Sequence, residues 1–95
     1  MKFEWEPAKN IANIAKHRVT FEEAITVFDD KYAVYLYDER HSEEEDRFYI
    51  IGESLDFREL TVCHCYRKND EIIRIISAWR ASKSESEYYN RSKMI

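Results

Sequence analysis

The 95-residue sequence contains one glycine, one proline and two cysteines, and it has no long run of apolar residues. So few glycines and prolines exclude collagen-like, linker and other low-complexity chains. No apolar stretch approaches the roughly 18 residues of a membrane-spanning helix, and none follows a charged start, so we expect no membrane span and no secretory signal. A glycine-rich phosphate loop, a Walker signature and a nucleophile elbow are also missing.

The two cysteines, Cys63 and Cys65, are separated by one residue. On an extended strand both side chains point the same way, which is poor geometry for a disulfide. His64 then points to the opposite face, so this triplet does not have the spacing of a zinc site. We therefore expect reduced thiols and a cytoplasmic protein.

The residues that are present indicate one folded domain. The chain is 44% hydrophobic and 15% aromatic, which is too much for a disordered protein although 36% of its residues are charged. A chain of this length has room for a single core, so we predict one domain over residues 1–95.

Charge is distributed unevenly along the chain. The net charge of −4 argues against a non-specific nucleic-acid binder. Residues 1–18 carry four basic and two acidic side chains, and residues 67–95 carry seven basic and four acidic ones. The middle, residues 19–66, carries only four basic but thirteen acidic side chains. If the two ends meet, they form a basic patch on an acidic protein; the alternative is ordinary surface charge. The acidic middle would also attract a basic partner segment.

The first thirty residues predict a short strand and two helices. Alternation over Lys2–Trp5 favours a strand, and Pro7 suits the first turn of a helix that ends near His17. Its apolar positions recur at helical spacing (Ala8, Ile11, Ala12 and Ala15), with Lys9, Asn13 and Lys16 on a polar face. The capping box Thr20–Glu23 opens a second amphipathic helix of about two turns, with Phe21, Ala24, Ile25 and Phe28 on one side.

After residue 30 the apolar period changes to two. Four strands are predicted, over Tyr32–Tyr37, Arg47–Ser54, Glu59–Arg67 and Glu71–Trp79. The last two connections are short enough for hairpins, so we predict an antiparallel sheet. A second capping box, Ser82–Glu85, opens a last helix. This order indicates an α+β fold in which two N-terminal helices pack on one face of the sheet, with a short C-terminal helix.

The last predicted strand has two faces. Strict alternation assigns Ile73, Ile75, Ser77 and Trp79 to the core, and Ile72, Arg74, Ile76, Ala78 and Arg80 to the other face. Arg74 and Arg80 would then lie about 20 Å apart on one face, a spacing that suits a polyanion. The alternative is that Arg74 pairs with an acid of a neighbouring strand.

Other candidate residues are less specific. His41 lies in the acidic loop, His17 ends the first helix, and a structural role is the alternative for both, as it is for His64. Four consecutive acids, Glu43–Asp46, are typical of a solvated loop rather than a metal site. We predict no metal site and no cofactor.

The sequence resembles the BrnT family of bacterial toxins, and the resemblance covers nearly the whole chain. It rests on the segments Phe3–Lys9, Asn13, Lys16–His17, Val19–Ala24, Val27–Asp30, His41–Ser42, Arg47, Ile51–Gly52, Ile73–Ala81, Glu85 and Tyr88–Tyr89. The resemblance implies a RelE-like fold and a toxin of a type II toxin–antitoxin system that cleaves mRNA and inhibits growth. It also implies a BrnA-like antitoxin with a ribbon-helix-helix domain, through which the pair binds operator DNA and represses its own operon. A hetero-tetramer of toxin and antitoxin is one expected assembly.

For the reaction we predict metal-independent RNA cleavage by a ribose 2′-hydroxyl. Arg74 and Arg80 would stabilise the charged phosphorane with support from Arg47, and His41 or His17 would move protons. Lys9, Lys16 and His17 would hold flanking parts of the RNA. Two alternatives remain: a non-catalytic module that only docks a protein partner, and a helix-turn-helix, which the acids Glu22, Glu23, Asp29 and Asp30 disfavour.

Overall fold

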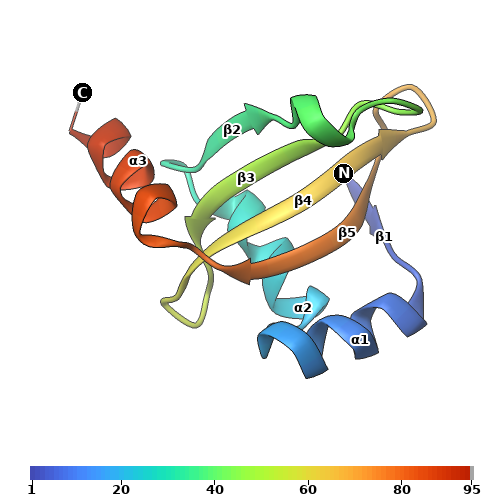
Figure 1. The fold of residues 1–95 in the computed structure, drawn as a ribbon, viewed down its shortest axis with the longest axis horizontal. Helices are drawn as coiled ribbons and strands as arrows, with labels where there is room; N and C mark the ends of the chain where they lie inside the picture. Colours follow the sequence, from blue (N-terminus) through green and yellow to red (C-terminus); the bar gives the residue numbers. More distant parts are fainter. Residues whose placement is uncertain (95) are drawn as a thin grey trace.

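The computed structural model describes residues 1–94, and its centre is a five-stranded sheet in the order β1-β5-β4-β3-β2 (Figure 1). The strands are β1 (Lys2–Glu4), β2 (Val34–Tyr37), β3 (Phe48–Glu53), β4 (Glu59–Arg67) and β5 (Ile72–Arg80). The helices are α1 (Pro7–His17), α2 (Phe21–Ala24) and α3 (Lys83–Lys93), with 3₁₀ turns η1 (Ile25–Asp29) and η2 (Glu39–His41). The α+β class is therefore confirmed.

The predicted antiparallel sheet is only partly correct. Strands β2 to β5 pair antiparallel, but β1 pairs parallel with β5, so the sheet is mixed. The reason is topological: α1 and α2 separate β1 from the other strands, and β1 joins the far edge, beside the last strand. A three-residue strand carries no sequence signal for its neighbour or its direction.

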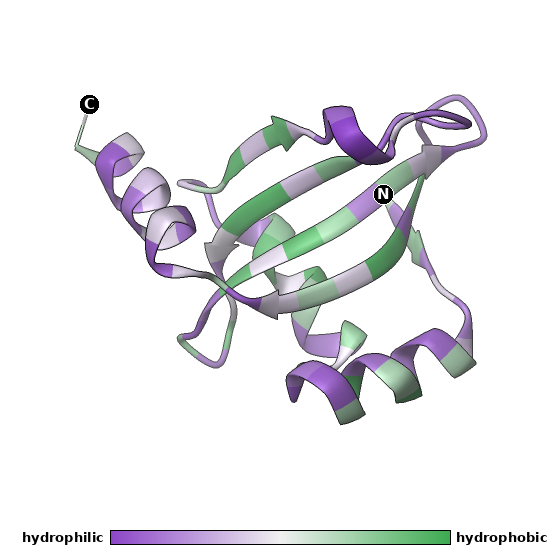
Figure 2. Ribbon diagram, viewed as in Figure 1, coloured by the Kyte–Doolittle hydropathy of each residue, from purple (hydrophilic) through white to green (hydrophobic). Residues whose placement is uncertain are grey.

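The core lies between the sheet and the segment that runs from Val19 to Val27. Phe21 and Ala24 of α2 pack with the inward side chains of the three long strands, among them Ile50, Val62 and Ile75. Figure 2 shows the same division, with hydrophobic residues along β3 and β4 and hydrophilic ones over η2 and the neighbouring loops. The second helix begins as predicted after Thr20, whose hydroxyl accepts from the Glu23 N–H, but it tightens into η1 after one turn.

Helix α1 uses its two faces differently from the sequence prediction. Ala8, Ile11, Ala12 and Ala15 are exposed, whereas Asn13, predicted on the polar face, is buried. The Asn13 side chain donates to the carbonyl oxygens of Val19 and Ala78 and accepts from the Ala78 N–H. Polar bonds to the open edge of β5 therefore fix this helix, and the burial of an apolar stripe does not.

Strand β5 contains a bulge at Ile76. Its partners in β4 shift register there, because Cys63 pairs with Ser77 and the next residue, His64, pairs with Ile75. One extra residue reverses the alternation of side chains beyond it. Consequently Ile73, Ile75 and Ala78 point into the core, while Arg74, Ser77 and Trp79 share the opposite face.

Candidate functional site

Two arginines lie near one another on the face of the sheet that α1 and α2 leave open. Arg74 of β5 pairs with Cys65 of β4, and Arg47 directly precedes Phe48, which pairs with His64. Arg47 is therefore level with Cys65 on the outer strand, and the three side chains project to the same side. Lys9, in the first turns of α1, reaches the same place from the edge of the sheet.

These cations surround a small pocket of about 120 Å³. It is lined by four cations and two carboxylates together with two isoleucines: Lys9, Arg47, Arg67, Arg74, Glu6, Glu45, Ile75 and Ile76. The cations come from α1, β4, β5 and the loop before β3. Cations from four segments that converge on one small space create a site for an anion with several oxygens, such as an RNA phosphate.

The carboxylates compensate some of these cations but not all. Arg67 Nη1 lies 2.5 Å from Glu45 Oε2, and Arg74 lies 3.3 Å from Glu4 Oε2 and 3.6 Å from Glu6 Oε1. Within residues 1–94, the Nε of Arg47 is buried and has no hydrogen-bond partner. A buried donor without a partner costs free energy, which singles out Arg47 among the cations of this pocket.

An aspartate–histidine pair lies beside this pocket. His41 Nδ1 is 3.0 Å from Asp38 Oδ2, and the Asp38 side chain is only 5% exposed, whereas that of His41 is 61% exposed. Since Asp38 holds Nδ1, Nε2 is the nitrogen left to meet a ligand. His41 lines a second, open pocket of about 360 Å³, and Arg47 and Glu45 line both pockets.

The local fold fixes Asp38 from several directions. Its backbone N–H donates to the Arg47 carbonyl oxygen at 2.9 Å, and Ser42 Oγ donates to the Asp38 carbonyl oxygen at 2.5 Å. Burial alone would raise the pKa of the Asp38 carboxyl, but hydrogen bonds from Tyr49 and His41 lower it. Burial and this bond to Asp38 raise the pKa of Tyr49 to about 12, so Tyr49 donates a proton and Asp38 stays an acceptor.

The structure brings together some of the residues singled out from the sequence and separates others. Arg47, Arg74 and Lys9 line the cationic pocket, and His41 lines the adjoining one. Lys16 is exposed near the other end of α1, and the ring of His17 lies 6.1 Å from that of Trp79. Seven residues of helix separate Lys16 from Lys9, which corresponds to about 10 Å.

The prediction that Arg74 and Arg80 share a face is wrong. Arg80 pairs with Leu60 on the face that the helices cover, and its charge acts on Glu23 of α2. The bulge at Ile76 is the physical reason, because it reverses the alternation between the two arginines. Lys9 and Arg47 therefore accompany Arg74, and Arg80 lies on the other side of the sheet.

Sequence reasoning missed four polar residues of this region: Asp38, Glu45, Tyr49 and Arg67. Arg67 carried a usable signal, because it follows Cys65 by two residues on a predicted strand and so shares its face. Glu45 was predicted to lie in a solvated loop, yet it faces Arg67. No pattern distinguishes it from the other three acids of that run.

Residues 1–94 contain neither a metal-binding cluster nor a membrane-spanning helix. No group of three or more histidine, cysteine, aspartate or glutamate side chains is arranged there to hold a metal ion. None of the helices in that part of the chain has the length and apolar character needed to cross a membrane.

Comparison with known proteins places this chain in a family. The family model described as "Ribonuclease toxin, BrnT, of type II toxin-antitoxin system" matches residues 5–85. The chain belongs to the BrnT family. A crystal structure of the Brucella abortus ribonuclease toxin BrnT superposes with a TM-score of 0.66 at 26% sequence identity. The match covers 87% of this chain and 99% of that one, whereas no curated protein matches. The resemblance seen in the sequence is thus confirmed, and membership of a type II system implies an antitoxin partner.

Proposed function

We propose that this BrnT-family protein is a cytoplasmic endoribonuclease that cleaves mRNA without a metal ion and thereby inhibits growth. The observation that carries the proposal is the position of Arg47. It lines both the cationic pocket and the pocket of His41, and its Nε is buried without a partner among residues 1–94. A phosphate bound to Arg47 would therefore meet three cations on one side and an imidazole on the other.

In the proposed reaction the ribose 2′-oxygen forms a bond to phosphorus, and its proton passes to a base. The bond from phosphorus to the 5′-oxygen breaks, and an acid protonates that oxygen. The products are a 2′,3′-cyclic phosphate and a 5′-hydroxyl, so atoms and protons balance without a redox step. Arg47, Arg74 and Lys9 would stabilise the charge that develops on the phosphorane.

His41 is our candidate for proton transfer, and Asp38 acts as its positioning residue. Asp38 accepts from Nδ1 and so selects the tautomer in which Nε2 is free to accept a proton. The exposure of the His41 ring leaves that nitrogen accessible to RNA. His17 and Lys16 lie outside the two pockets, so the role of Lys16 in holding RNA and that of His17 in holding RNA or moving protons stay predictions. Arg80, predicted to stabilise the phosphorane, lies on the face opposite Arg74 and has no part in the proposed reaction.

The test is cleavage of a defined RNA by the purified protein, with the 3′ and 5′ ends of the products identified. Replacing Arg47 or Arg74 by alanine should lower the rate roughly 100-fold, as expected when one group that stabilises the transition state is lost. Arg80→Ala, on the opposite face of the same strand as Arg74, is the matched control and should lose less than tenfold. Cleavage that stops when Mg²⁺ is chelated would reject the metal-free reaction.

We further propose a BrnA-like antitoxin with a ribbon-helix-helix domain as the partner, with operator DNA bound only through the antitoxin. Support comes from membership of a type II toxin family. Co-expression with the neighbouring gene should relieve growth arrest, and light scattering of the complex tests for a hetero-tetramer. The toxin alone should leave operator DNA unshifted in a gel, because an acidic protein gains little from phosphate contacts.

A non-catalytic docking module is the alternative. It is favoured by three half-exposed tyrosines in and before the edge strand β2, Tyr32, Tyr35 and Tyr37, since tyrosine is common at interfaces. A protein that binds the antitoxin tightly but neither cleaves RNA nor arrests growth would establish this alternative and reject the ribonuclease.

A further inference from the structure

The turn between β3 and β4 exposes two large apolar side chains. Leu55 is 71% exposed and Phe57 is 83% exposed, although both lie within a five-residue connection, Ser54–Arg58. In Figure 1 this turn projects beside α2, at the end of the sheet opposite the β4–β5 turn. An exposed leucine and an exposed phenylalanine in one turn are unfavourable in water unless a partner covers them.

The backbone at Phe57 makes this arrangement more unusual. Its φ is +61°, in the left-handed region that glycine and asparagine adopt with least strain. A bulky aromatic residue at such a position is an outlier in protein structures. Neither local stability nor burial accounts for phenylalanine here, because the residue strains the turn and contributes almost nothing to the core.

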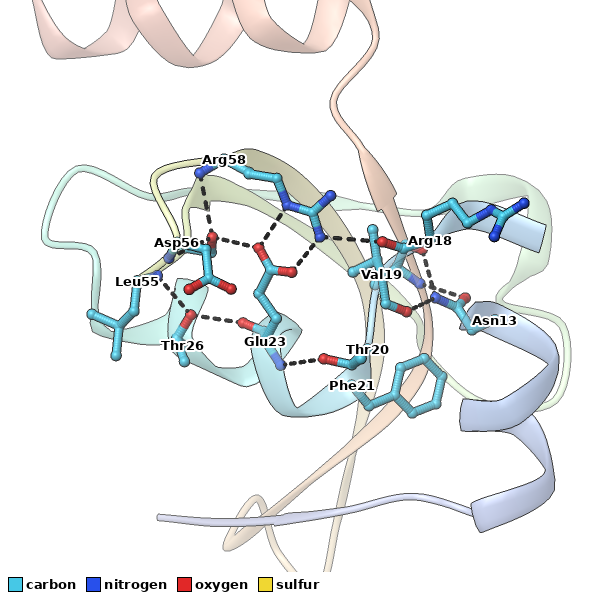
Figure 3. Close-up of polar contacts among 12 residues, drawn as sticks. Asn13, Arg18, Val19, Thr20, Phe21, Glu23, Thr26, Leu55, Asp56 and Arg58 are labelled. Atoms are coloured by element: carbon cyan, nitrogen blue, oxygen red, sulfur yellow. Dashed lines mark hydrogen bonds and ion pairs between the residues drawn. The ribbon is translucent and has the colours of Figure 1, made fainter. Parts of the chain in front are cut away.

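The turn is held rigidly from both sides. Ser54 and Phe57 close it through an N–H···O bond of 3.0 Å, and the Ser54 N–H donates to the Arg58 carbonyl oxygen at 2.8 Å. The Leu55 N–H donates to Thr26 Oγ1 at 3.0 Å, which ties the turn to η1. The turn is anchored by Glu23, which accepts from the Arg58 guanidinium (Figure 3). Glu23 also accepts from Ser54 Oγ. A partner that binds Leu55 and Phe57 would therefore lose little free energy to ordering the backbone of this turn.

The charge around the turn selects the kind of partner. Leu55 and Phe57 line a shallow cavity of about 220 Å³ together with Asp29, Asp30 and Glu53. The Arg58 guanidinium is paired with Glu23, and Lys93 acts on Asp30, so Asp29 and Glu53 are the acids left to attract a partner. RNA would be repelled by them, and a second copy of this chain would bring the same acids against its own. A segment with basic residues beside an apolar side chain complements both features.

We propose that Leu55 and Phe57 are the anchor on which a basic segment of the antitoxin docks. The proposal rests on the proposed function, which names that partner. The anchor follows β3, whereas Arg47 precedes it, and the six residues of β3 span about 20 Å. A segment that binds at this turn therefore leaves the cationic pocket uncovered. Its binding adds to the affinity for the antitoxin and to the selection of the correct partner, but it does not by itself inhibit cleavage.

The experiment compares the full-length toxin with Phe57→Asn, Phe57→Gly and Leu55→Ser, using the protein encoded by the neighbouring gene as the probe in a calorimetric titration. Each variant should weaken binding by about tenfold or more, as expected for an anchor side chain. The Phe57 variants should melt at the same temperature as the wild type or a few degrees higher, because asparagine and glycine relieve the strain. RNA cleavage by the free variants should stay at the wild-type rate.

Ile11→Ser is the matched control, since Ile11 is 69% exposed on α1 and remote from the turn. It should bind the antitoxin as tightly as the wild type. Asp29→Asn and Glu53→Gln should weaken binding at low salt and reduce its dependence on salt, since they remove charges that attract the partner.

Three results would overturn the proposal: an affinity unchanged in both Phe57 variants, no binding of the probe by the wild type, or a wild-type dimer that Phe57→Asn dissociates. The last result would assign the turn to a second copy. A wild type that fails to cleave RNA, together with a Phe57-dependent complex, would reject the ribonuclease and leave the docking site standing.

Discussion

The side chain of Asn13 in α1 forms hydrogen bonds with both backbone groups of Ala78 in β5, although the two residues are 65 positions apart in the sequence. The Asn13 amide nitrogen donates to the Ala78 carbonyl oxygen at 2.8 Å, and its oxygen accepts from the Ala78 N–H at 3.0 Å. The side chain thus occupies the place of a neighbouring strand, where β1 has already ended. It also donates to Val19, so it fixes the helix, the following turn and the sheet edge at once.

Asn13→Leu should therefore destabilise the fold strongly. The substitution leaves two buried backbone groups of β5 without partners, which costs roughly 2–4 kcal/mol in the free energy of unfolding. Chemical denaturation checks this value. Asn10→Leu is the control, because Asn10 lies on the same helix and its side chain bonds the Phe21 N–H and the exposed Glu22. This variant should lose clearly less free energy of unfolding than Asn13→Leu.

Glu23→Gln should also destabilise the protein, by about 2 kcal/mol. Hydrogen bonding to Arg58 holds the pKa of Glu23 below its usual value against the opposing effect of burial. A carboxyl with a lowered folded pKa contributes stability above its unfolded pKa near 4.5, and that contribution is lost as the pH falls through the folded value. Urea titrations at pH 7 and pH 3 should show the difference between wild type and variant shrinking at the lower pH. Glu87→Gln, an exposed change, should have no effect at either pH.

His64 should make the fold sensitive to mild acid. The imidazole is fully buried among the rings of Phe28, Phe48 and Tyr66, and burial lowers its pKa to about 4. His64 of the unfolded chain takes up a proton near pH 6.5, whereas that of the folded chain does so only near pH 4. The free energy of unfolding therefore falls by about 3 kcal/mol as the pH drops from 6.5 to 4. Denaturation between pH 7 and 4.5 measures most of this loss, above the range where carboxylates dominate. In His64→Phe the decline over that interval should be much smaller; an equally steep decline would show that another group causes it.

Glu45→Gln should strengthen the binding of RNA. Glu45 pairs with Arg67 inside the cationic pocket, so RNA has to displace a carboxylate that the protein itself supplies. Removing this charge should tighten binding of a non-cleavable RNA several-fold at low salt, because one more cation becomes available to phosphate. Glu87→Gln, exposed on α3 and outside the lining of both pockets, is the control. Equal effects of the two changes would mean that only net charge matters and that the Arg67 pair does not.

The sequence predicted those parts of the fold that depend on local chemistry. The bounds of β4 were obtained correctly from alternation alone, and the Ser82–Glu85 capping box is present with both reciprocal bonds. The similar motif at Thr20 forms only one of its two bonds, because the Glu23 side chain turns to Arg58. That partner lies 35 residues away, and no local pattern reveals it.

The errors arise where apolar residues occupy both faces of an element. In β5, isoleucines occupy both faces of the strand, with Ile73 and Ile75 on one face and Ile72 on the other. The sequence pattern therefore contains no sign of the bulge that places Arg74 and Arg80 on opposite faces. In α1, small apolar residues at helical spacing predict a buried face, whereas hydrogen bonds of one asparagine decide which face is buried. Of the candidate site, Arg47, Arg74 and Lys9 were found because cations on predicted elements are visible in a sequence. Glu45 was not, since its partner Arg67 lies 22 residues away, and Asp38 was missed although its partner His41 follows it by only three residues.

The bulge at Ile76 also limits how the length of β5 can vary. Deleting Ile76 itself would restore strict alternation and leave Ser77 and Ala78 opposite Cys63 and Val62, whereas deleting Ala78 would place Trp79 opposite Val62, on the core side of the sheet. An indole would then have to occupy the space of a methyl group beside Val62, while the stacking of Trp79 on Tyr49 and its bond to Glu85 would be lost. A deletion of one residue is therefore tolerable at the bulge but not in the half of the strand beyond it.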